Sequence, residues 1–312
     1  MGVLSFYKKI AKEILKSMPE EYSRKVVEYY VKKIFFSENT IPLPVFSLYI
    51  CNSLRLNKED KFFVATLSTL IYFMADIYDD AEDDEVPSEF SKELLIVTAS
   101  LLQNKIFKNI SDSNYAAEIK LKLFSTISTF LSEMVKGQIM DITLTTCPNS
   151  YPYEIPELKA GMEVSLFFLL PCLLSNDSNL CNKLKLLGFN FGKYLQILSD
   201  YLDIWYKDFS KDISQLKITL PIFIGFRSGN RELLELFSSD RDHPDNQMRI
   251  RQLLIKVGAN REFKNFFYEN KKQVVDIVGE EKIFKELVKQ VNTLYNTGKE
   301  LIEVLNELED EL

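Results

Sequence analysis

The chain has 312 residues, of which 46% are hydrophobic and 27% are charged, a composition typical of a globular protein with a large core. Its formal net charge of −7 argues against a nucleic-acid partner, because phosphate backbones are bound by clustered lysine and arginine side chains. Only 10 glycines and 10 prolines occur, and long stretches without either residue favour an all-α fold over a sheet with many turns.

Helical periodicity predicts helices along the whole chain. In chain order, their expected ranges are 3–17, 20–36, 42–54, 58–80, 88–107, 113–145, 155–175, 180–208, 217–227, 231–239, 246–278 and 281–309. The connections between them are short, and none is a long linker rich in glycine and serine. We therefore predict a single domain over residues 1–312.

The amino-terminal residues 1–18 spread lysines through an amphipathic pattern and lack the apolar segment of a secretion signal. No run of 18 apolar residues occurs, so stable insertion into a membrane is not expected. No two cysteines have CxxC spacing, and we predict reduced core thiols and a cytoplasmic location. The four cysteines are Cys51, Cys147, Cys172 and Cys181.

Residues 62–73 are apolar on nearly every side, which is typical of a helix buried in the centre of a bundle. This segment runs into a cluster of carboxylates that includes Asp79, Asp80 and Asp83. Asp79 and Asp83 would lie one helical turn apart, where like charges repel. They would also oppose the helix dipole, which favours cations at the carboxyl end of a helix. Either a solvated acidic loop or a bound metal ion would explain the cluster.

A second apolar segment, residues 186–205, contains Asp200 and Asp203. Mg²⁺ binds carboxylate oxygens and substrate phosphates together, so two carboxylate groups facing a cavity could hold a diphosphate through metal ions. Lys159 and Lys217 stand at the edges of apolar helices. Each fits either an ordinary surface position or a contact with the diphosphate.

Five segments in chain order match a known set of motifs. They are DDAED (79–83), GQIMD (137–141), ELKAG (157–161), QILSDYLD (196–203) and DISQLKITLP (212–221). They resemble the DDxxD, GQxxD, K-[TA]-G, QxxDDxxD and DLxEGKxTLP segments of the trans-isoprenyl diphosphate synthase, or polyprenyl synthetase, superfamily. A lone DDxxD would be a weak signal, whereas five segments in the right order are a specific one.

The resemblance implies an isoprenoid synthase helical bundle around a deep apolar central pocket, in which three Mg²⁺ ions hold an allylic prenyl diphosphate. By similarity, the catalytic carboxylates would be Asp79, Asp80 and Asp83, and the metal ligands would be Asp79, Asp83, Asp200 and Asp203. Lys159, Lys217 and Gln138 would contact the diphosphate. Asp141, Gln196 and Ser199 would orient these groups.

The same resemblance implies that the pocket is lined by Phe73, Met74, Ala75, Phe168 and Phe191. Aromatic faces can stabilise a carbocation, and aromatic residues at helical spacing are also common in plain cores. Met74 and Ala75 precede the first motif and are not aromatic, which by family logic leaves the pocket floor open to C15 or C20 substrates. Homodimers are common among proteins of this kind, so a second copy is an expected partner.

Several motifs of chain-elongating synthases are missing. Those enzymes hold isopentenyl diphosphate with a GGKRxR segment, a histidine before the first aspartate motif and an arginine pair after it. The corresponding residues here, 39–46, 64–73 and 83–90, contain none of these. Ser199 also replaces the first aspartate of the second motif, which weakens one metal site or leaves Asp200 in its place. The sequence therefore resembles degenerate members, such as pheromone-peptide isoprenyl transferases and synthase-like bacterial terpene synthases.

We predict a magnesium-dependent class I isoprenoid synthase that ionises an allylic prenyl diphosphate without isopentenyl diphosphate, with a terpene synthase as the first expectation. The alternative is a prenyltransferase acting on a peptide or another non-diphosphate acceptor. A chain-elongating synthase and a non-catalytic partner subunit remain further alternatives. Ser199 favours the partner subunit, and the retained Lys159 and Lys217 oppose it.

Overall fold

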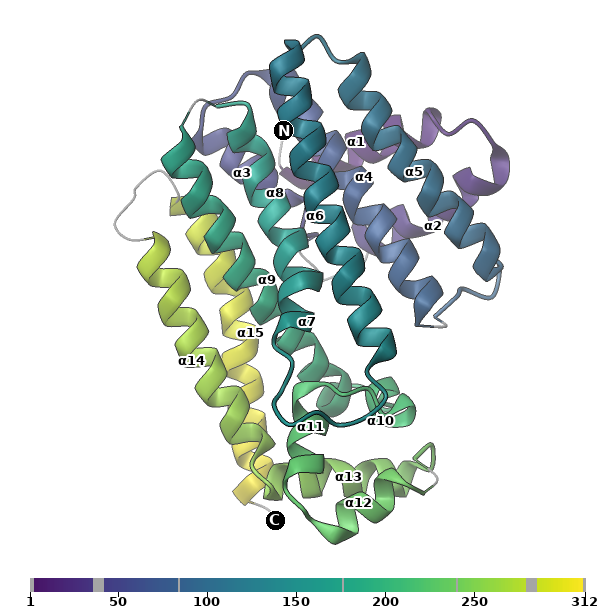
Figure 1. Cartoon of the computed structure of the whole chain (residues 1–312), viewed down its shortest axis with the longest axis vertical. Coiled ribbons are helices and arrows are strands. Elements are labelled where there is room, and N and C mark those ends of the chain that lie inside the picture. Colours follow the sequence, from purple (N-terminus) through teal and green to yellow (C-terminus); the bar gives the residue numbers. More distant parts are fainter. Residues whose placement is uncertain are drawn as a thin grey trace. The chain divides into compact units, whose positions relative to one another are not determined.

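Helices are the only regular secondary structure in residues 3–35, 42–83, 85–175, 177–239, 241–278 and 285–310, which the computed structural model describes (Figure 1). The predicted all-α class is confirmed. The deep central pocket stays a prediction.

The helices follow the predicted ranges closely, with a few differences. In chain order they are α1 (Val3–Lys16), α2 (Glu21–Phe35), α3 (Val45–Ser53), α4 (Lys58–Glu82), α5 (Lys92–Asp112), α6 (Ala117–Thr143), α7 (Glu154–Pro156), the π-helical turn η1 (Glu157–Gly161), α8 (Met162–Leu173), α9 (Ser178–Tyr206), α10 (Lys211–Gln215), α11 (Leu220–Arg227), α12 (Arg231–Phe237), α13 (Pro244–Lys256), α14 (Ala259–Val278) and α15 (Lys285–Asp310). The predicted helix over 246–278 is two helices, because Gly258 adopts a left-handed φ of 97° between them.

Contacts divide the chain into two compact units, and each is described by itself. Unit 1 comprises Met1–Thr129 and Leu166–Lys185, and unit 2 comprises Phe130–Ser165 and Leu186–Leu312. The single domain over residues 1–312 stays a prediction.

In unit 1, α4 is the central helix and packs against α1, α2, α3 and α5 (Figure 1). It begins where the Asn57 side chain accepts a hydrogen bond from the Asp60 N–H, a common N-terminal cap. It buries apolar residues on several sides, including Leu67, Ile71 and Ile77. Among the described residues it is the one helix long and apolar enough to cross a membrane by length and composition, and 56% of that stretch is buried. A central core helix has the same properties.

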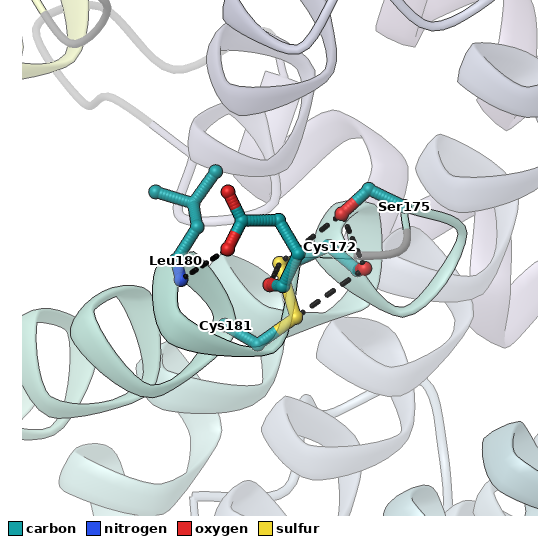
Figure 2. The surroundings of a disulfide bond; sticks show 5 residues. Cys172, Ser175, Leu180 and Cys181 are labelled. Carbon is teal, nitrogen blue, oxygen red and sulfur yellow. Dashed lines mark hydrogen bonds between the residues drawn. A yellow bond between two sulfur atoms is a disulfide. The ribbon is translucent and has the colours of Figure 1, made fainter.

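A disulfide joins Cys172, near the end of α8, to Cys181 in the first turn of α9 (Figure 2). Their Cα atoms lie 5.5 Å apart, within the usual range for a disulfide. The turn between the helices brings them together: the Ser175 hydroxyl donates to the Cys172 carbonyl at 2.9 Å, and the Leu180 N–H donates to Asp177 Oδ1 at 3.0 Å. The prediction of reduced thiols is therefore wrong for this pair.

The other two cysteines follow the prediction. Cys51 is buried and free, and Cys147 is half-buried and free. The error arose because a nine-residue separation carries no disulfide signal until the intervening turn is known. The cysteines consequently no longer support the expected cytoplasmic location.

Candidate active site

The first acidic cluster lies in the last two turns of α4, in unit 1. Asp79 is exposed and Asp83, which caps the helix, is half-buried. The Asp83 N–H donates to the Asp79 carbonyl at 2.9 Å, and the Glu85 N–H donates to the Asp80 carbonyl at 2.8 Å. These bonds satisfy carbonyls that a helix end would otherwise leave without partners. The helix therefore ends with Asp79 and Asp83 one turn apart on its accessible end.

Asp80 lies in a different environment, because it is only 8% exposed. The Tyr30 hydroxyl donates to its Oδ2 at 2.7 Å, and Lys33 Nζ donates to both of its oxygens at 2.8 and 3.1 Å. The same ammonium lies 3.3 Å from Asp76 Oδ2. Asp80 therefore serves as a hydrogen-bonded anchor between α4 and α2, and its catalytic role stays a prediction.

Asp76 shows how costly this concentration of carboxylates is. Burial raises its pKa to about 6, Lys33 opposes that shift, and the neighbouring Asp80 charge adds to it. Tyr30 and Lys33 were missed by the sequence reasoning. Their only signal is that they lie three residues apart, on one face of α2, and nothing in the motif itself points to a segment so far upstream.

In unit 2, close helix packing positions the second group of site residues. A Cβ on Gly137 of α6 would lie 2.7 Å from the Leu158 Cβ in η1, and a Cβ on Gly192 of α9 would lie 2.1 Å from the Ala160 carbonyl oxygen. Only glycine permits approaches this close. The π-helical turn η1, a feature often found at functional sites, is thereby held between α6 and α9.

This packing brings Lys159 and Asp141 together. Their side chains form an ion pair at 2.7 Å, with 12% and 21% of their areas exposed. Gln138 is half-buried one turn before Asp141 on α6. The arrangement is consistent with the predicted role of Asp141, which was to orient the lysine that contacts the diphosphate.

Asp200 lies in the same region of unit 2 and is 8% exposed. Gln196 Nε2 donates to its Oδ1 at 3.0 Å. Burial raises the pKa of Asp200 to about 7; the hydrogen bond from Gln196 opposes the shift, as do the charges of Lys159 and Lys217, while Asp141 adds to it. The structure therefore brings five of the predicted site residues within electrostatic range of one another.

Asp203 is 7% exposed and is surrounded by donors from its own unit. Lys207 Nζ lies 2.6 Å from its Oδ1, while the Ser210 hydroxyl and the Asp212 N–H donate to its Oδ2 at 2.6 and 3.1 Å. Burial alone would raise the pKa of Asp203, but these donors hold it below its ordinary value. A metal ion at this carboxylate would have to share its oxygens with these donors.

The loop that supplies these donors is itself fixed by a buried glutamine. Gln247 accepts a hydrogen bond from the Ser210 N–H at 2.9 Å and donates to the Ser210 carbonyl at 3.1 Å. The sequence reasoning missed Ser210, Asp212 and Gln247. It also missed Lys207, although a lysine four residues after Asp203 on a helix is a recognisable pairing signal.

Ser199 is exposed, whereas the next residue, Asp200, is buried. Consecutive residues on an α-helix point about 100° apart. Asp200 therefore cannot present its carboxylate in the direction of Ser199 while α9 keeps this orientation. Both alternatives, a weakened metal site and Asp200 in place of the missing aspartate, stay predictions.

Tyr151 is a further residue that the sequence reasoning assigned only to a connection. Its ring lies 4.8 Å from that of Tyr153 and 5.7 Å from that of Phe223, measured between centroids. Burial raises the pKa of the Tyr151 hydroxyl well above its usual value, and the charges of Asp200 and Asp141 raise it further. Tyr151 therefore belongs to the environment of Asp200.

The predicted pocket residues lie in packed aromatic groups within each unit. In unit 1, the ring centroid of Phe73 lies 5.9 Å from that of Phe35, and the ring centroid of Phe168 lies 5.6 Å from that of Phe46. In unit 2, Phe191 lies 5.9 Å from Tyr295. Phe73, Phe168 and Phe191 have no exposed area, Met74 is 5% exposed and Ala75 is half-buried. Their role as pocket lining stays a prediction.

The segment compared with the cationic GGKRxR motif is partly visible. Residues 39–41 lie outside the described part of the chain, while residues 42–46 precede and begin α3. Val45 is 5% exposed and Phe46 is completely buried. The described portion therefore consists of apolar packing.

The carboxylate ligands fit a magnesium site in which the protein supplies only some of the ligands. Across the described residues, no group of three or more histidine, cysteine, aspartate or glutamate side chains is arranged to hold a metal ion by itself. Mg²⁺ often uses one or two carboxylates and completes its coordination with water and substrate phosphates. Asp79 and Asp83, at the accessible end of α4, suit that arrangement.

Comparisons with known proteins agree with these features. Residues 66–254 match the family model described as Polyprenyl synthetase. The geranylfarnesyl diphosphate synthase of Natronomonas pharaonis is 26% identical over a segment covering 41% of each protein, so the match spans about two fifths of that curated relative.

Two solved structures cover nearly the whole chain. A geranylgeranyl pyrophosphate synthetase from the archaeon Geoglobus acetivorans has a TM-score of 0.74 at 20% identity, over 98% of this chain and 97% of that one. A polyprenyl synthase from Caulobacter crescentus CB15, complexed with calcium and isoprenyl diphosphate, has a TM-score of 0.72 at 12% identity, over 97% and 94%. At these identities the similarity establishes a shared fold.

Proposed function

The chain belongs to the polyprenyl synthetase family, and on this premise we propose that it is a magnesium-dependent class I isoprenoid synthase that ionises an allylic prenyl diphosphate of C15 or C20 length. The observation that carries the proposal is the accessible pair Asp79 and Asp83, one turn apart at the end of α4, next to a separately neutralised Asp80. A purely solvated acidic loop would not need the buried anchor to Tyr30 and Lys33.

In this proposal Asp79 and Asp83 hold Mg²⁺, which neutralises the diphosphate and makes it a better leaving group when bound. By resemblance to the family motifs, Lys159 and Lys217 would contribute positive charge to the diphosphate as negative charge develops on it. Asp141 keeps Lys159 in place through their 2.7 Å ion pair. Gln138 donates to the diphosphate. The proposal includes three ions, with Asp200 and Asp203 as further ligands.

The fate of the carbocation separates two candidate functions. The absence of a cationic cradle in the sequence supports quenching within one substrate, as in a terpene synthase, because no second diphosphate would be held. The similarity to a geranylfarnesyl diphosphate synthase and to a geranylgeranyl pyrophosphate synthetase favours chain elongation with isopentenyl diphosphate instead. We take the first as the leading candidate and the second as its competitor.

One experiment distinguishes them. Purified protein and Mg²⁺ are incubated with geranyl, farnesyl and geranylgeranyl diphosphates, with and without isopentenyl diphosphate, and the products are identified by mass spectrometry. A hydrocarbon or alcohol from a single substrate supports the terpene synthase, whereas longer diphosphates support elongation. Diphosphate consumption only when a peptide is added would instead indicate a peptide prenyltransferase, and no turnover at all would favour a partner subunit.

We also propose that the protein forms a homodimer through α6. On the part of this helix in unit 2, Val135, Ile139 and Ile142 are 58%, 56% and 55% exposed, and their spacing of four and three residues forms one apolar stripe. A second copy of the chain would cover such a stripe. Light scattering should give twice the chain mass, and Ile139→Glu should reduce it to a single chain.

A further inference from the structure

Lys33 brings a positive charge into the first acidic cluster from outside the motif. Its ammonium lies within hydrogen-bonding distance of both Asp80 oxygens and 3.3 Å from Asp76 Oδ2. Tyr30, three residues earlier on the same face of α2, donates to Asp80 as well and places its ring centroid 5.1 Å from the ammonium. Asp80 thus receives three hydrogen bonds from two side chains and is kept away from solvent.

The Lys33 ammonium lies in a strongly negative region at the end of α4. Four carboxylates, at positions 76, 79, 80 and 83, fall within about two turns, and the carboxyl end of the helix adds partial negative charge. A divalent cation at the accessible pair is attracted by all four charges, including those that it does not touch. The positive charge of Lys33 offsets one of these negative charges and so weakens the attraction for the divalent cation.

Lys33 keeps its charge under ordinary conditions. Burial by itself would lower the pKa of the ammonium, but Asp76 and Asp80 raise it by more, so the pKa lies above its usual value. Its side chain is still 41% exposed, so the charge acts through a partly hydrated environment. The cluster therefore contains a resident cation before any metal ion arrives.

We propose that Lys33 is a positioning residue that lowers the affinity of Asp79 and Asp83 for a divalent cation until a diphosphate is present. The inference rests on the proposed function, because it assumes that this pair is the metal site. With Lys33 in place, the protein alone holds the ion weakly, and the phosphate oxygens supply the missing negative charge. Metal and diphosphate then bind with positive coupling, and each must strengthen the binding of the other by the same factor.

The test measures Mn²⁺ binding to the whole protein from the electron paramagnetic resonance signal of free Mn²⁺, with and without inorganic pyrophosphate. Lys33→Met should bind Mn²⁺ roughly tenfold more tightly than the wild type without pyrophosphate, since a unit charge near the site is lost. The strengthening by pyrophosphate should fall by a similar factor. Lys33→Arg, which keeps the charge, should behave as the wild type.

Salt provides a readout that a merely structural role would not change. The difference between the wild type and Lys33→Met should shrink when KCl is raised from about 0.1 M to about 1 M, because the Debye length falls from about 10 Å to about 3 Å. The double variant Lys33→Met with Asp80→Asn restores the net charge of the cluster and should return to the affinity of the wild type. If Lys33→Met does not fold, Lys33→Gln carries the same expectation and keeps a donor for Asp80.

Equal Mn²⁺ affinity in the wild type and the uncharged Lys33 variants would overturn the inference alone. Binding that Asp79→Asn leaves unchanged would instead remove the metal site from the proposed function, and the inference with it. Weaker binding in Lys33→Met, at unchanged thermal stability, would also overturn the inference. It would mean that Lys33 promotes metal binding rather than restraining it.

Discussion

The acidic clusters at the ends of α4 and α9 differ in what surrounds their carboxylates. In the first, the donors gather on Asp80, which lies between the accessible Asp79 and Asp83. In the second, the donors gather on Asp203 itself, which was predicted to bind metal. Each cluster contains a resident lysine, but Lys33 comes from another helix, α2, whereas Lys207 is the first residue after α9, the helix that carries its partner.

Two similar acidic motifs can therefore have different roles, one in binding a metal ion and the other in stabilising the local structure. Asp203 has donors on both oxygens, and a metal ion would have to share those oxygens with them. Asp79 is exposed and Asp83 is half-buried at the end of α4. We therefore expect the first cluster to control metal binding and the second to control local stability.

The largest expected effect is on activity. Asp79→Ala should lower turnover by on the order of 10²–10³-fold, the usual range for losing one group that stabilises developing charge. The fold should be retained, since the residue is exposed. Turnover is measured with the allylic diphosphate that the wild type consumes in the product assay, and circular dichroism reports the melting temperature. If Asp79→Ala keeps activity within twofold of the wild type, the first cluster does not control metal binding and the two clusters do not differ in role.

Gly192→Ala should disturb the second region and leave the first intact. The added Cβ would lie 2.1 Å from the Ala160 carbonyl oxygen, a backbone atom that cannot move aside without shifting η1. Overpacking of this kind costs about 3 kcal/mol, measured by urea unfolding.

Gly229→Ala is the control for adding a Cβ without a close contact, because nothing lies within 4 Å of it; unlike Gly192, which lies inside α9, Gly229 has a left-handed φ of 66°. It should cost only about 1–2 kcal/mol, from backbone conformation alone. Equal losses in the two variants would mean that the close approach of η1 and α9 does not constrain the site.

Asp203→Ala should reduce the free energy of unfolding by about 1.5–3 kcal/mol, the range for hydrogen bonds to a charged group. The Ser210 hydroxyl would lose this partner, and the Asp212 N–H would lose its bond. Urea unfolding with EDTA present excludes any contribution from metal. If Asp79→Ala destabilises the protein as much as Asp203→Ala does, the proposed division of roles fails.

The fold was largely predictable from sequence because its signals are local. Long apolar helices, short connections and the ordered motifs led to the all-α class and to the family. The break at Gly258 was missed because the apolar pattern continues across it, and only the left-handed backbone reveals the end of α13.

The site was only partly predictable, because its environment is not local. Asp141, Lys159 and Lys217 all act electrostatically on Asp200, and all four lie in motifs that the sequence reasoning selected. The partners of Asp80 lie in α2, far upstream of the motif, and no pattern in either segment connects them. Ser210 and Gln247 are likewise brought to Asp203 only by the packing of α13 near the loop after α9.

The smallest expected effect is that of replacing Lys207, and it tests what holds the second cluster together. Lys207 is 59% exposed and pairs with Asp203 at an i,i+4 spacing, an arrangement usually worth about 0.3–0.5 kcal/mol. Lys207→Met should therefore reduce the free energy of unfolding by no more than that amount, because the bonds from Ser210 and Asp212 still hold Asp203 Oδ2. Urea unfolding of this variant, Asp203→Ala and the double variant gives the coupling between the two residues. A coupling above about 1 kcal/mol would mean that the lysine, rather than the loop, holds the second cluster together. The two clusters would then be built on the same principle, and the preference for the first as the metal site would lose its structural basis.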